Sequence, residues 1–180
     1  RFLQERLMVS GGVRYETFKV NQYQRGQPVY RAGATWRALK ATYLRASYGQ
    51  GFRFPTLGER YIRTELDQVR VLPNENLDAE FSVNVEGGIK QGFRIGGFSG
   101  YVDVVAFQQD IDHYVEFTFA TWAPGTPGNP LGGVGFKSVN TGGARITGLE
   151  TEVAGKGNIG PVELTLLMGY THTKPISTTP

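Results

Sequence analysis

The amino-acid sequence predicts an all-β protein, a partial antiparallel up-and-down transmembrane β-barrel of about seven strands. Three observations lead to this prediction. Apolar and polar residues alternate with a period of two along most of the chain. Several of these runs reach about 10 residues, the length that crosses a bilayer, whereas strands of soluble sheets most often have about 5 to 6. The links between the runs alternate between short and long, as in outer-membrane barrels.

The composition is that of a folded β-protein rich in turns. Of the 180 residues, 39% are hydrophobic and 19% are charged, which excludes a disordered chain. Glycine occurs 25 times, about twice the roughly 7% of average usage. The net charge of +3 is dispersed along the chain, so no nucleic-acid partner is expected. Cysteine is absent, which excludes disulfides and thiolate ligands.

Seven runs of residues carry the alternation, and each is expected to form one strand. In the run 80–90, for example, apolar Val83 is followed by polar Asn84. The phase of the alternation changes near Val105 and again at Gly148, and a β-bulge near Val105 would reconcile the first change. The expected strands cover residues 7–16, 29–36, 44–53, 80–90, 98–119, 136–153 and 162–173.

The links favour an up-and-down order of strands with all short turns at one end of the sheet. The longer links, rich in Pro and Gly or in charge, would then lie at the other end. Periplasmic turns and extracellular loops of outer-membrane barrels are arranged in this way. Short links are expected at 37–40, 91–96 and 155–161, long ones at 54–76 and 120–134, and an intermediate one, on the long side, at 21–27.

Alternation alone would also fit a soluble β-sandwich, whose strands have one apolar and one polar face. Aromatic residues near the strand ends favour the membrane barrel, because they form girdles at the membrane interfaces. Two alternatives stay open: a complete barrel of about eight strands with a structural or adhesive role, and a soluble β-sandwich binding module. The aromatic residues are Tyr15, Trp36, Tyr48, Phe52, Phe81 and Tyr170.

Motifs that would indicate an enzyme or a metal site are weak. The stretch 155–160 matches the dinucleotide fingerprint G-x-G-x-x-G. Pro161 and an alternating run follow where a helix should begin, so a hairpin turn is expected there. His113 and His172 are the two histidines, too few and too separated for a metal site made by the protein alone. We therefore expect no enzyme, no catalytic residue, no metal site and no cofactor.

Several short stretches resemble sequence boxes of the C-terminal barrel half of TonB-dependent outer-membrane receptors. Each box is weak by itself, but together they occur in the expected order. The boxes are Ser47–Pro55 with Leu57 and Glu59, Asn74–Glu80, Glu86–Lys90, Val139–Glu150 and Gly169–Thr171.

The resemblance implies a barrel of about 22 strands closed around an N-terminal plug domain. It further implies uptake of a scarce ligand across the outer membrane of a Gram-negative bacterium, with energy supplied through the TonB–ExbB–ExbD complex. Residues 1–180 are then expected to be a fragment of the barrel domain, in contact with the lipid bilayer, without the plug or the TonB box. The expected ligand is a small iron chelate, with a ferric siderophore favoured.

The boxes also bear on the ligand that the resemblance implies. Haem receptors of this family carry a Phe-Arg-Ala-Pro box and an Asn-Pro-Asn-Leu or Asn-Pro-Asp-Leu box, with a ligating histidine between them. This chain has Phe52–Pro55 and Asn74–Leu77 but no histidine between them. Tyr61 is the obvious iron ligand in that interval, so haem is put in doubt.

Two sets of residues are candidates for function. The first set is expected to face the lumen and the plug, where glycines leave space. The paired acids Glu150 and Glu152 are expected to be part of a hydrated lumen wall and not a catalytic acid and base. The second set is expected to bind ligand, because arginine and tyrosine donate hydrogen bonds to anionic groups. The lumen-facing candidates are Gly49, Gly51, Glu86, Glu150 and Glu152, and the ligand-binding candidates are Arg53 at the rim and Arg60, Tyr61 and Arg63 in the long loop that follows.

Overall fold

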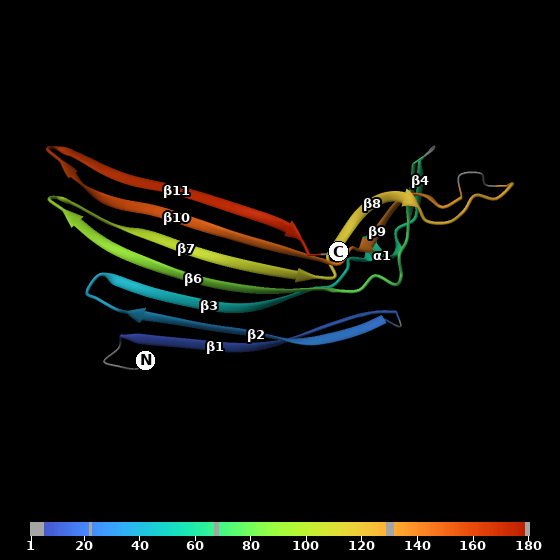
Figure 1. The fold of residues 1–180 in the computed structure, drawn as a ribbon, viewed down its shortest axis with the longest axis horizontal. Coiled ribbons are helices and arrows are strands. Elements are labelled where there is room, and N and C mark those ends of the chain that lie inside the picture. The colour runs from blue at the N-terminus through green and yellow to red at the C-terminus, as the bar shows by residue number, and fades with distance from the viewer. Residues whose placement is uncertain (1–5, 22, 67–68, 129–131, 179–180) are drawn as a thin grey trace. The chain divides into compact units, whose positions relative to one another are not determined.

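The computed structural model describes residues 6–21, 23–66, 69–128 and 132–178, and most of them are in strands (Figure 1). Within these residues no helix has the length and hydrophobicity needed to span a membrane. The elements are β1 (Leu7–Val20), β2 (Tyr23–Arg37), β3 (Thr42–Arg53), α1 (Leu57–Tyr61), β4 (Thr64–Leu66), β5 (Val69–Leu72), β6 (Glu80–Ile95), β7 (Phe98–Asp112), β8 (Val115–Thr121), β9 (Val134–Asn140), β10 (Gly143–Ile159) and β11 (Val162–Ser177).

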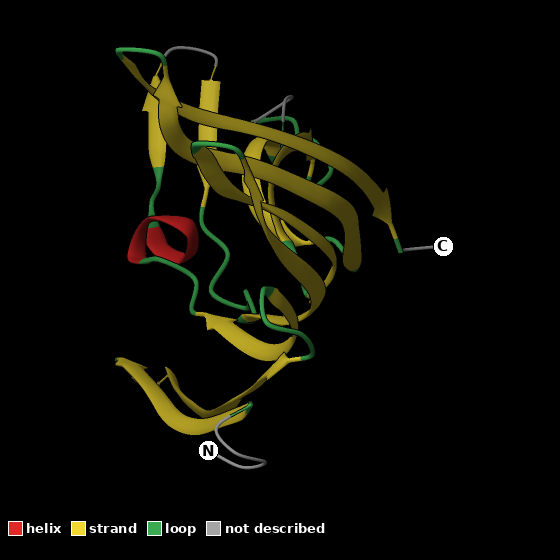
Figure 2. Ribbon diagram, turned by 90° about the vertical axis from the view of Figure 1, so that its left-hand side faces the viewer, coloured by secondary structure: helices red, strands yellow, loops and turns green. Residues whose placement is uncertain are grey.

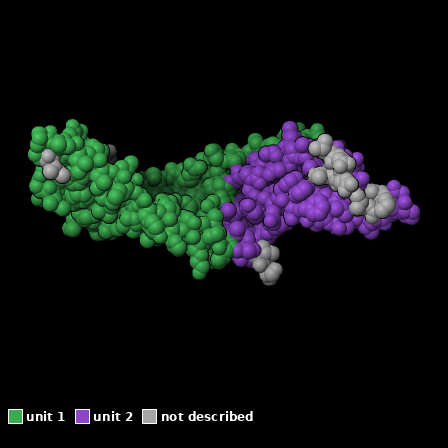
Figure 3. All heavy atoms as spheres, turned by 90° about the horizontal axis from the view of Figure 1, so that it is seen from above, with its two compact units in different colours: residues 1–51, 82–110, 145–176 green, residues 52–81, 111–144, 177–180 purple. Residues whose placement is uncertain are grey.

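The chain forms two compact units, which are coloured separately in Figure 3. Each unit contains segments that are far apart in the sequence. Unit 1 comprises residues 1–51, 82–110 and 145–176, and unit 2 comprises residues 52–81, 111–144 and 177–180.

Seven long strands, which lie mostly in unit 1, form one sheet. Their order in the sheet, β1-β2-β3-β6-β7-β10-β11, follows the order in the sequence, so the sheet is up-and-down as predicted. Among the described residues β1 and β11 are its two edges, and the sheet is therefore open. The alternative of a complete barrel of eight strands is wrong.

The strand register confirms the two faces that the alternation predicted. Val13 lies opposite Tyr30, and Gly12 lies opposite Arg31, in the antiparallel β1–β2 pair. In the β2–β3 pair, Arg31 lies opposite Gly49. Directly opposite residues of an antiparallel pair share a face. Apolar side chains therefore gather on one face of the sheet, here called the apolar face, and polar residues and glycines gather on the other, the polar face.

The apolar face is not covered by a second layer in the way a β-sandwich requires. Among the described residues, the buried hydrophobic side chains are those of Val29, Leu77 and Val105. On the apolar face, Val13 is 67% exposed and Tyr15 is 68% exposed. A sandwich would pack such side chains against a facing sheet, so the alternative of a soluble β-sandwich is also wrong.

Three short turns join consecutive strands at the same end of the sheet, on the left in Figure 1. Gly96 (φ 57°) and Gly160 (φ 60°) begin two of them in the left-handed conformation, which tight hairpins require and glycine adopts readily. The G-x-G-x-x-G stretch, which was predicted to be a hairpin turn, belongs to β10 as far as Ile159, and only Gly160 lies in the turn. The turns are residues 38–41, 96–97 and 160–161.

The structure differs from the predicted pattern of links and strands at several places. The short links predicted at 91–96 and 155–161 are reduced to 96–97 and 160–161, because β6 continues to Ile95 and β10 to Ile159. The link predicted at 21–27 is wrong, because β1 and β2 stay paired as far as Val20 and Tyr23. The strand predicted at 98–119 is divided into β7 and β8 at His113 (φ 56°), and the strand predicted at 136–153 is divided into β9 and β10 at Gly142 (φ 64°). A residue in the left-handed backbone conformation interrupts an extended strand. A bulge in β7 stays a prediction.

Unit 2 contains a smaller sheet in the order β4-β5-β9-β8, in which β5 and β9 are parallel. The helix α1, red in Figure 2, precedes it in the chain. At the start of α1, the Glu59 N–H donates to Thr56 Oγ1, and the Glu59 carboxylate accepts from the Thr56 N–H. This capping box satisfies N–H groups that a helix start leaves free, which explains why so short a helix forms here.

Candidate functional site

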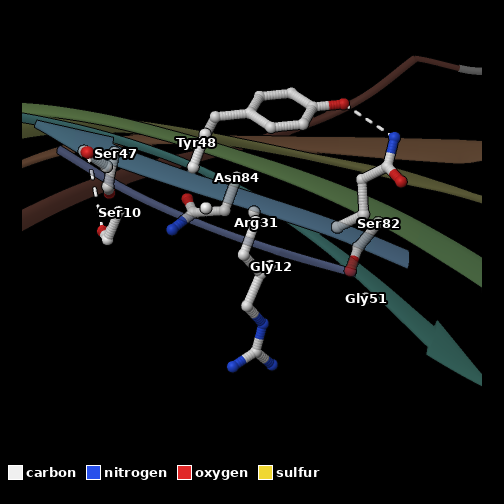
Figure 4. Close-up of a pocket in the computed structure, with 13 residues that line it drawn as sticks. Ser10, Gly12, Arg31, Ser47, Tyr48, Gly51, Ser82 and Asn84 are labelled. Carbon is white, nitrogen blue, oxygen red and sulfur yellow. Dashed lines mark hydrogen bonds between the residues drawn. The ribbon is translucent and has the colours of Figure 1, made fainter. Parts of the chain in front are cut away.

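The polar face of the sheet carries a groove of about 630 Å³ (Figure 4). Residues of β1, β2, β3 and β6 form its wall, so the groove lies within unit 1. Many of these residues have a small side chain or none, and this leaves the hollow open. We call it the glycine groove, and its wall includes Gly12, Arg31, Gly49, Gly51, Ser82 and Asn84.

Arg31 has a glycine beside it on both neighbouring strands. Gly12 and Gly49 are its register partners on β1 and β3, and its side chain extends away from the sheet in Figure 4. A Cβ at Gly12 or at Gly49 would meet no atom within 4 Å, and neither residue has a positive φ. Nothing in the described residues therefore requires glycine at these two positions, and the missing side chains leave space beside the guanidinium.

Gly51, the second glycine that was predicted to face the lumen, has a local reason for lacking a side chain. A Cβ at Gly51 would lie 2.6 Å from Ser82 Oγ. That distance is shorter than a real contact, so Ser82 would have to change its rotamer. The close approach of β3 and β6 thus explains Gly51, whereas it does not explain Gly49.

Charged side chains on the polar face are paired across four strands. Asp103 is 8% exposed and accepts from Arg45 Nη1 at 2.7 Å, with Lys90 Nζ 3.3 Å away. Lys90 Nζ also lies 3.9 Å from the centre of the Tyr101 ring, and the Tyr101 hydroxyl donates to Glu152 at 2.5 Å. These contacts compensate charges that would be costly to leave alone where they are buried.

The three acids that were predicted to face the lumen differ in their surroundings. Glu86 accepts from Ser47 Oγ at 3.3 Å and from Asn84 Nδ2 at 2.6 Å. Glu86 and Glu152 therefore both lie among the polar residues of the sheet. Glu150 is exposed, and the structure does not bring it into these contacts.

Arg53, which was predicted to bind ligand at the rim, is held between two carboxylates of unit 2. Its Nε donates to Glu80 Oε2 at 2.5 Å. Its Nη1 donates to both carboxylate oxygens of Glu59 at 3.1 Å. The guanidinium is thus held in place and compensated within the chain, and a contact between Arg53 and a ligand stays a prediction.

The surroundings of Glu59 favour its charged form. Burial raises the pKa of the Glu59 carboxyl, but hydrogen bonds from the Thr56 N–H and from Arg53 outweigh burial, and the pKa lies below its ordinary value. Glu59 is therefore ionised at neutral pH, where it pairs with Arg53 and caps α1.

The other three ligand-binding candidates lie in α1 or just after it. Arg60 is 4% exposed, and its guanidinium donates to the backbone carbonyl oxygens of Glu75 and of Leu77. Arg60 therefore holds this backbone in place and is closed to a ligand. Tyr61 is half-buried and Arg63 is exposed, so these two residues remain open to contact from solvent.

Two asparagines that sequence reasoning did not single out join the long loops of unit 2. Asn74 Nδ2 donates to the carbonyl oxygen of Ser138 at 2.8 Å. Asn140 Nδ2 donates to the carbonyl oxygen of His113 at 2.8 Å. Both asparagines lie inside boxes that carry the family resemblance, so a signal was present in the sequence. The sequence of the boxes does not, however, indicate which residue accepts the hydrogen bond from each asparagine.

The wall of the glycine groove carries polar groups that can form hydrogen bonds. Arg31, Ser82 and Asn84 present a guanidinium, a hydroxyl and an amide around the open hollow. Such donors suit polar and anionic groups. In the part of the chain that the structure describes, no group of three or more His, Asp or Glu side chains is placed to hold a metal ion.

Solved structures with the same fold are receptors and transporters. The hemophore receptor HasR of Serratia marcescens, solved with its hemophore HasA and heme, has a TM-score of 0.71 and 18% identity over 93% of this chain and 29% of HasR. The siderophore receptor PirA of Pseudomonas aeruginosa has a TM-score of 0.62 and 20% identity over 96% of this chain and 30% of PirA. The FrpB iron transporter of Neisseria meningitidis has a TM-score of 0.63 and 20% identity over 98% of this chain and 25% of FrpB.

The extent of these matches agrees with an open sheet of seven strands. The chain spans less than a third of the length of each of these proteins. The family described as TonB dependent receptor-like, beta-barrel matches residues 1–180, which is the whole chain. The chain therefore belongs to the TonB-dependent receptor family and forms part of its β-barrel.

Proposed function

We propose that this chain is part of an outer-membrane receptor of a Gram-negative bacterium that takes up a scarce ligand by TonB-dependent active transport. The observation that carries the proposal is the match of the whole chain to the receptor barrel family. The exposed apolar face supports the proposal, because such a face is stable in contact with lipid.

In this proposal the apolar face contacts lipid and the polar face lines the lumen. The glycine groove then lies on the inside of the barrel wall, where a plug domain could approach the backbone closely. The plug, which is not in this chain, would connect the receptor to the TonB–ExbB–ExbD complex. The receptor would bind and release its ligand without changing it chemically.

We further propose a ferric siderophore as the ligand. Arg63 and Tyr61 are the candidates that remain open to contact, and they can donate hydrogen bonds to the anionic oxygens of an iron chelate. The interval between Pro55 and Asn74 contains no histidine to ligate haem iron. The similarity to PirA, a siderophore receptor, and to HasR, solved with heme, supports the fold and not the choice between these ligands.

The test is uptake by the complete receptor that contains this chain. It would be expressed in a Gram-negative host without iron receptors of its own, and the host would be given radioiron as a ferric catecholate, as a ferric hydroxamate or as haemin, and labelled cyanocobalamin in parallel. We expect accumulation of one of the two ferric siderophore types, and none in a matched host without TonB.

The outcomes test the receptor function and the choice of ligand separately. Uptake of haemin or cyanocobalamin alone would keep the receptor function and overturn the siderophore. Uptake that persists without TonB, or no uptake of any compound by a receptor that is folded in the membrane, would overturn active transport of this class of ligand.

A further inference from the structure

The segment 54–79 leaves and rejoins the large sheet through two residues that are bonded to each other. Arg53, the last residue of β3, donates through Nε to Glu80, the first residue of β6. The same guanidinium binds both carboxylate oxygens of Glu59 in α1. The base of this segment is therefore closed by an ion pair, and α1 is tied to the closure.

The segment 113–142 is closed at its base by backbone and amide hydrogen bonds. The Tyr114 N–H donates to the carbonyl oxygen of Gly142 at 3.0 Å. Asn140 Nδ2 donates to the carbonyl oxygen of His113 at 2.8 Å. The two ends of this segment are thus held side by side by residues of the segment itself.

The residues that close the two segments also join them to each other. Glu80 Oε1 accepts from the Val115 N–H at 2.6 Å. Asn140 and Asp78 bond in both directions, since the Asp78 N–H donates to Asn140 Oδ1 at 2.8 Å and Asn140 Nδ2 donates to the Asp78 carbonyl oxygen at 3.1 Å. We call these contacts the loop latch, made by Arg53, Glu59, Asp78, Glu80 and Asn140.

The contacts of the loop latch form a connected network, which differs from a single ion pair on the surface. An isolated exposed pair contributes little to stability. Here the Glu80 side chain is 14% exposed and the Glu59 side chain is 25% exposed, and both face one guanidinium. Planar guanidinium donors reach two carboxylates at once, which the point charge of a lysine cannot do with the same geometry.

We propose that the loop latch holds the bases of segments 54–79 and 113–142 to each other, beyond the reach of the β5–β9 pairing that also joins their described residues, with Arg53 and Asn140 as its positioning residues. The proposal rests on the proposed function, in which segment 54–79 carries the ligand-binding candidates Tyr61 and Arg63. Latched segments present a preformed surface, so the binding of a ligand does not have to order each segment separately.

The experiment measures the distance between the two segments in the complete receptor in detergent, without ligand or TonB. Spin labels are attached at Glu75→Cys and Glu116→Cys, one near the base of each segment and both outside the β5–β9 pairing. This chain has no cysteine of its own, and any cysteine elsewhere in the complete receptor is replaced by serine. Pulsed electron resonance should give one narrow distance distribution in the labelled parent. We expect the width to increase at least twofold in both Arg53→Gln and Asn140→Ala, and by a smaller amount in Arg53→Lys.

A matched control distinguishes the loss of the loop latch from a general loss of rigidity in the receptor. Arg14 pairs with Glu16 in unit 1, so Arg14→Gln removes an arginine–glutamate pair without touching either segment. It should leave the width unchanged. Folding is checked by the heat-dependent migration of the barrel on a gel. If a main variant does not fold, Glu59→Gln and Asn140→Asp replace it, with the same expectation.

A width that stays at the parent value in either the Arg53 or the Asn140 variant would overturn the proposal. Equal broadening in Arg14→Gln would overturn it as well. Because neither ligand nor TonB takes part, this result is independent of the uptake experiment, and a failure of the loop latch is distinguishable from a failure of the proposed function.

Discussion

At the scale of single residues, the neighbours of each arginine determine whether it is open to a ligand. Arg53, Arg60 and Arg63 are chemically alike in the sequence. In the structure Arg53 is paired with two carboxylates and Arg60 is buried against backbone carbonyls, whereas Arg63 is exposed. Ligand contact by Arg63 and Tyr61 stays a prediction.

Gly49→Leu is expected to impair uptake and to leave barrel assembly unchanged. A Cβ at Gly49 meets nothing within 4 Å, so the described residues can accept the leucine, which would fill the glycine groove. We expect uptake to fall on the order of tenfold, which corresponds to about 1.4 kcal/mol, while heat-dependent gel migration stays the same. Gly87→Leu is the matched control, because Gly87 lies on the apolar face and also has open space. Equal uptake by the Gly49 and Gly87 variants would refute the role of the groove.

At the scale of elements, the structure combines long strands with short pieces that depend on particular contacts. The strands of the large sheet follow from alternation and pair with their sequence neighbours. The helix α1 has five residues, too few to be stable by itself. Its capping box and the pair between Glu59 and Arg53 therefore maintain it.

We expect α1 to loosen in acid through Glu59. The pKa of Glu59 in the folded chain is below its ordinary value of 4.5. Ionised Glu59 therefore stabilises the fold at neutral pH, and this contribution is lost as the pH falls below 4.5 and through the folded pKa. Hydrogen exchange of the α1 amides, corrected for the intrinsic rate, should show this loss.

The matched variant for that experiment is Glu59→Gln. It should reduce protection of α1 at neutral pH and remove most of the pH dependence below it. If the dependence persisted in full, the titrating group would be another acid, and Glu80, which binds the same guanidinium, would be the next to test.

At the scale of the whole molecule, the exposed apolar face limits the surroundings in which the chain is stable. Large apolar side chains are exposed along several strands, as Val13, Tyr15 and Met168 illustrate at 67%, 68% and 56%. A soluble monomer seldom exposes a continuous apolar surface of this kind. The open edges of β1 and β11 add unpaired backbone groups that other strands could pair with.

The chain of residues 1–180 is therefore expected to need detergent to remain dispersed. Sedimentation velocity should show aggregates in buffer and a small uniform species in detergent micelles, because detergent covers the apolar face. A stable monomer in buffer alone would contradict this expectation and would require the apolar face to be buried in some other way.

The sequence by itself determined the all-β class, the two faces of the strands, the up-and-down order and the family. Alternation is a local property, because successive side chains of a strand point to opposite faces whatever the strand pairs with. For this reason the partners Gly12, Arg31 and Gly49 could be assigned to one face before their register was known, and the register agrees.

Only the tertiary structure decided where the long strands break and which charges are compensated. The breaks at His113 and Gly142 depend on backbone conformation, and the parallel pairing of β5 with β9 joins segments that are distant in the sequence. The contact of Arg53 with Glu80 and the contacts of Arg60 with Glu75 and Leu77 likewise span 15 to 27 positions. A local pattern does not specify such partners, because the free energy of each contact depends on which groups the folded chain brings together.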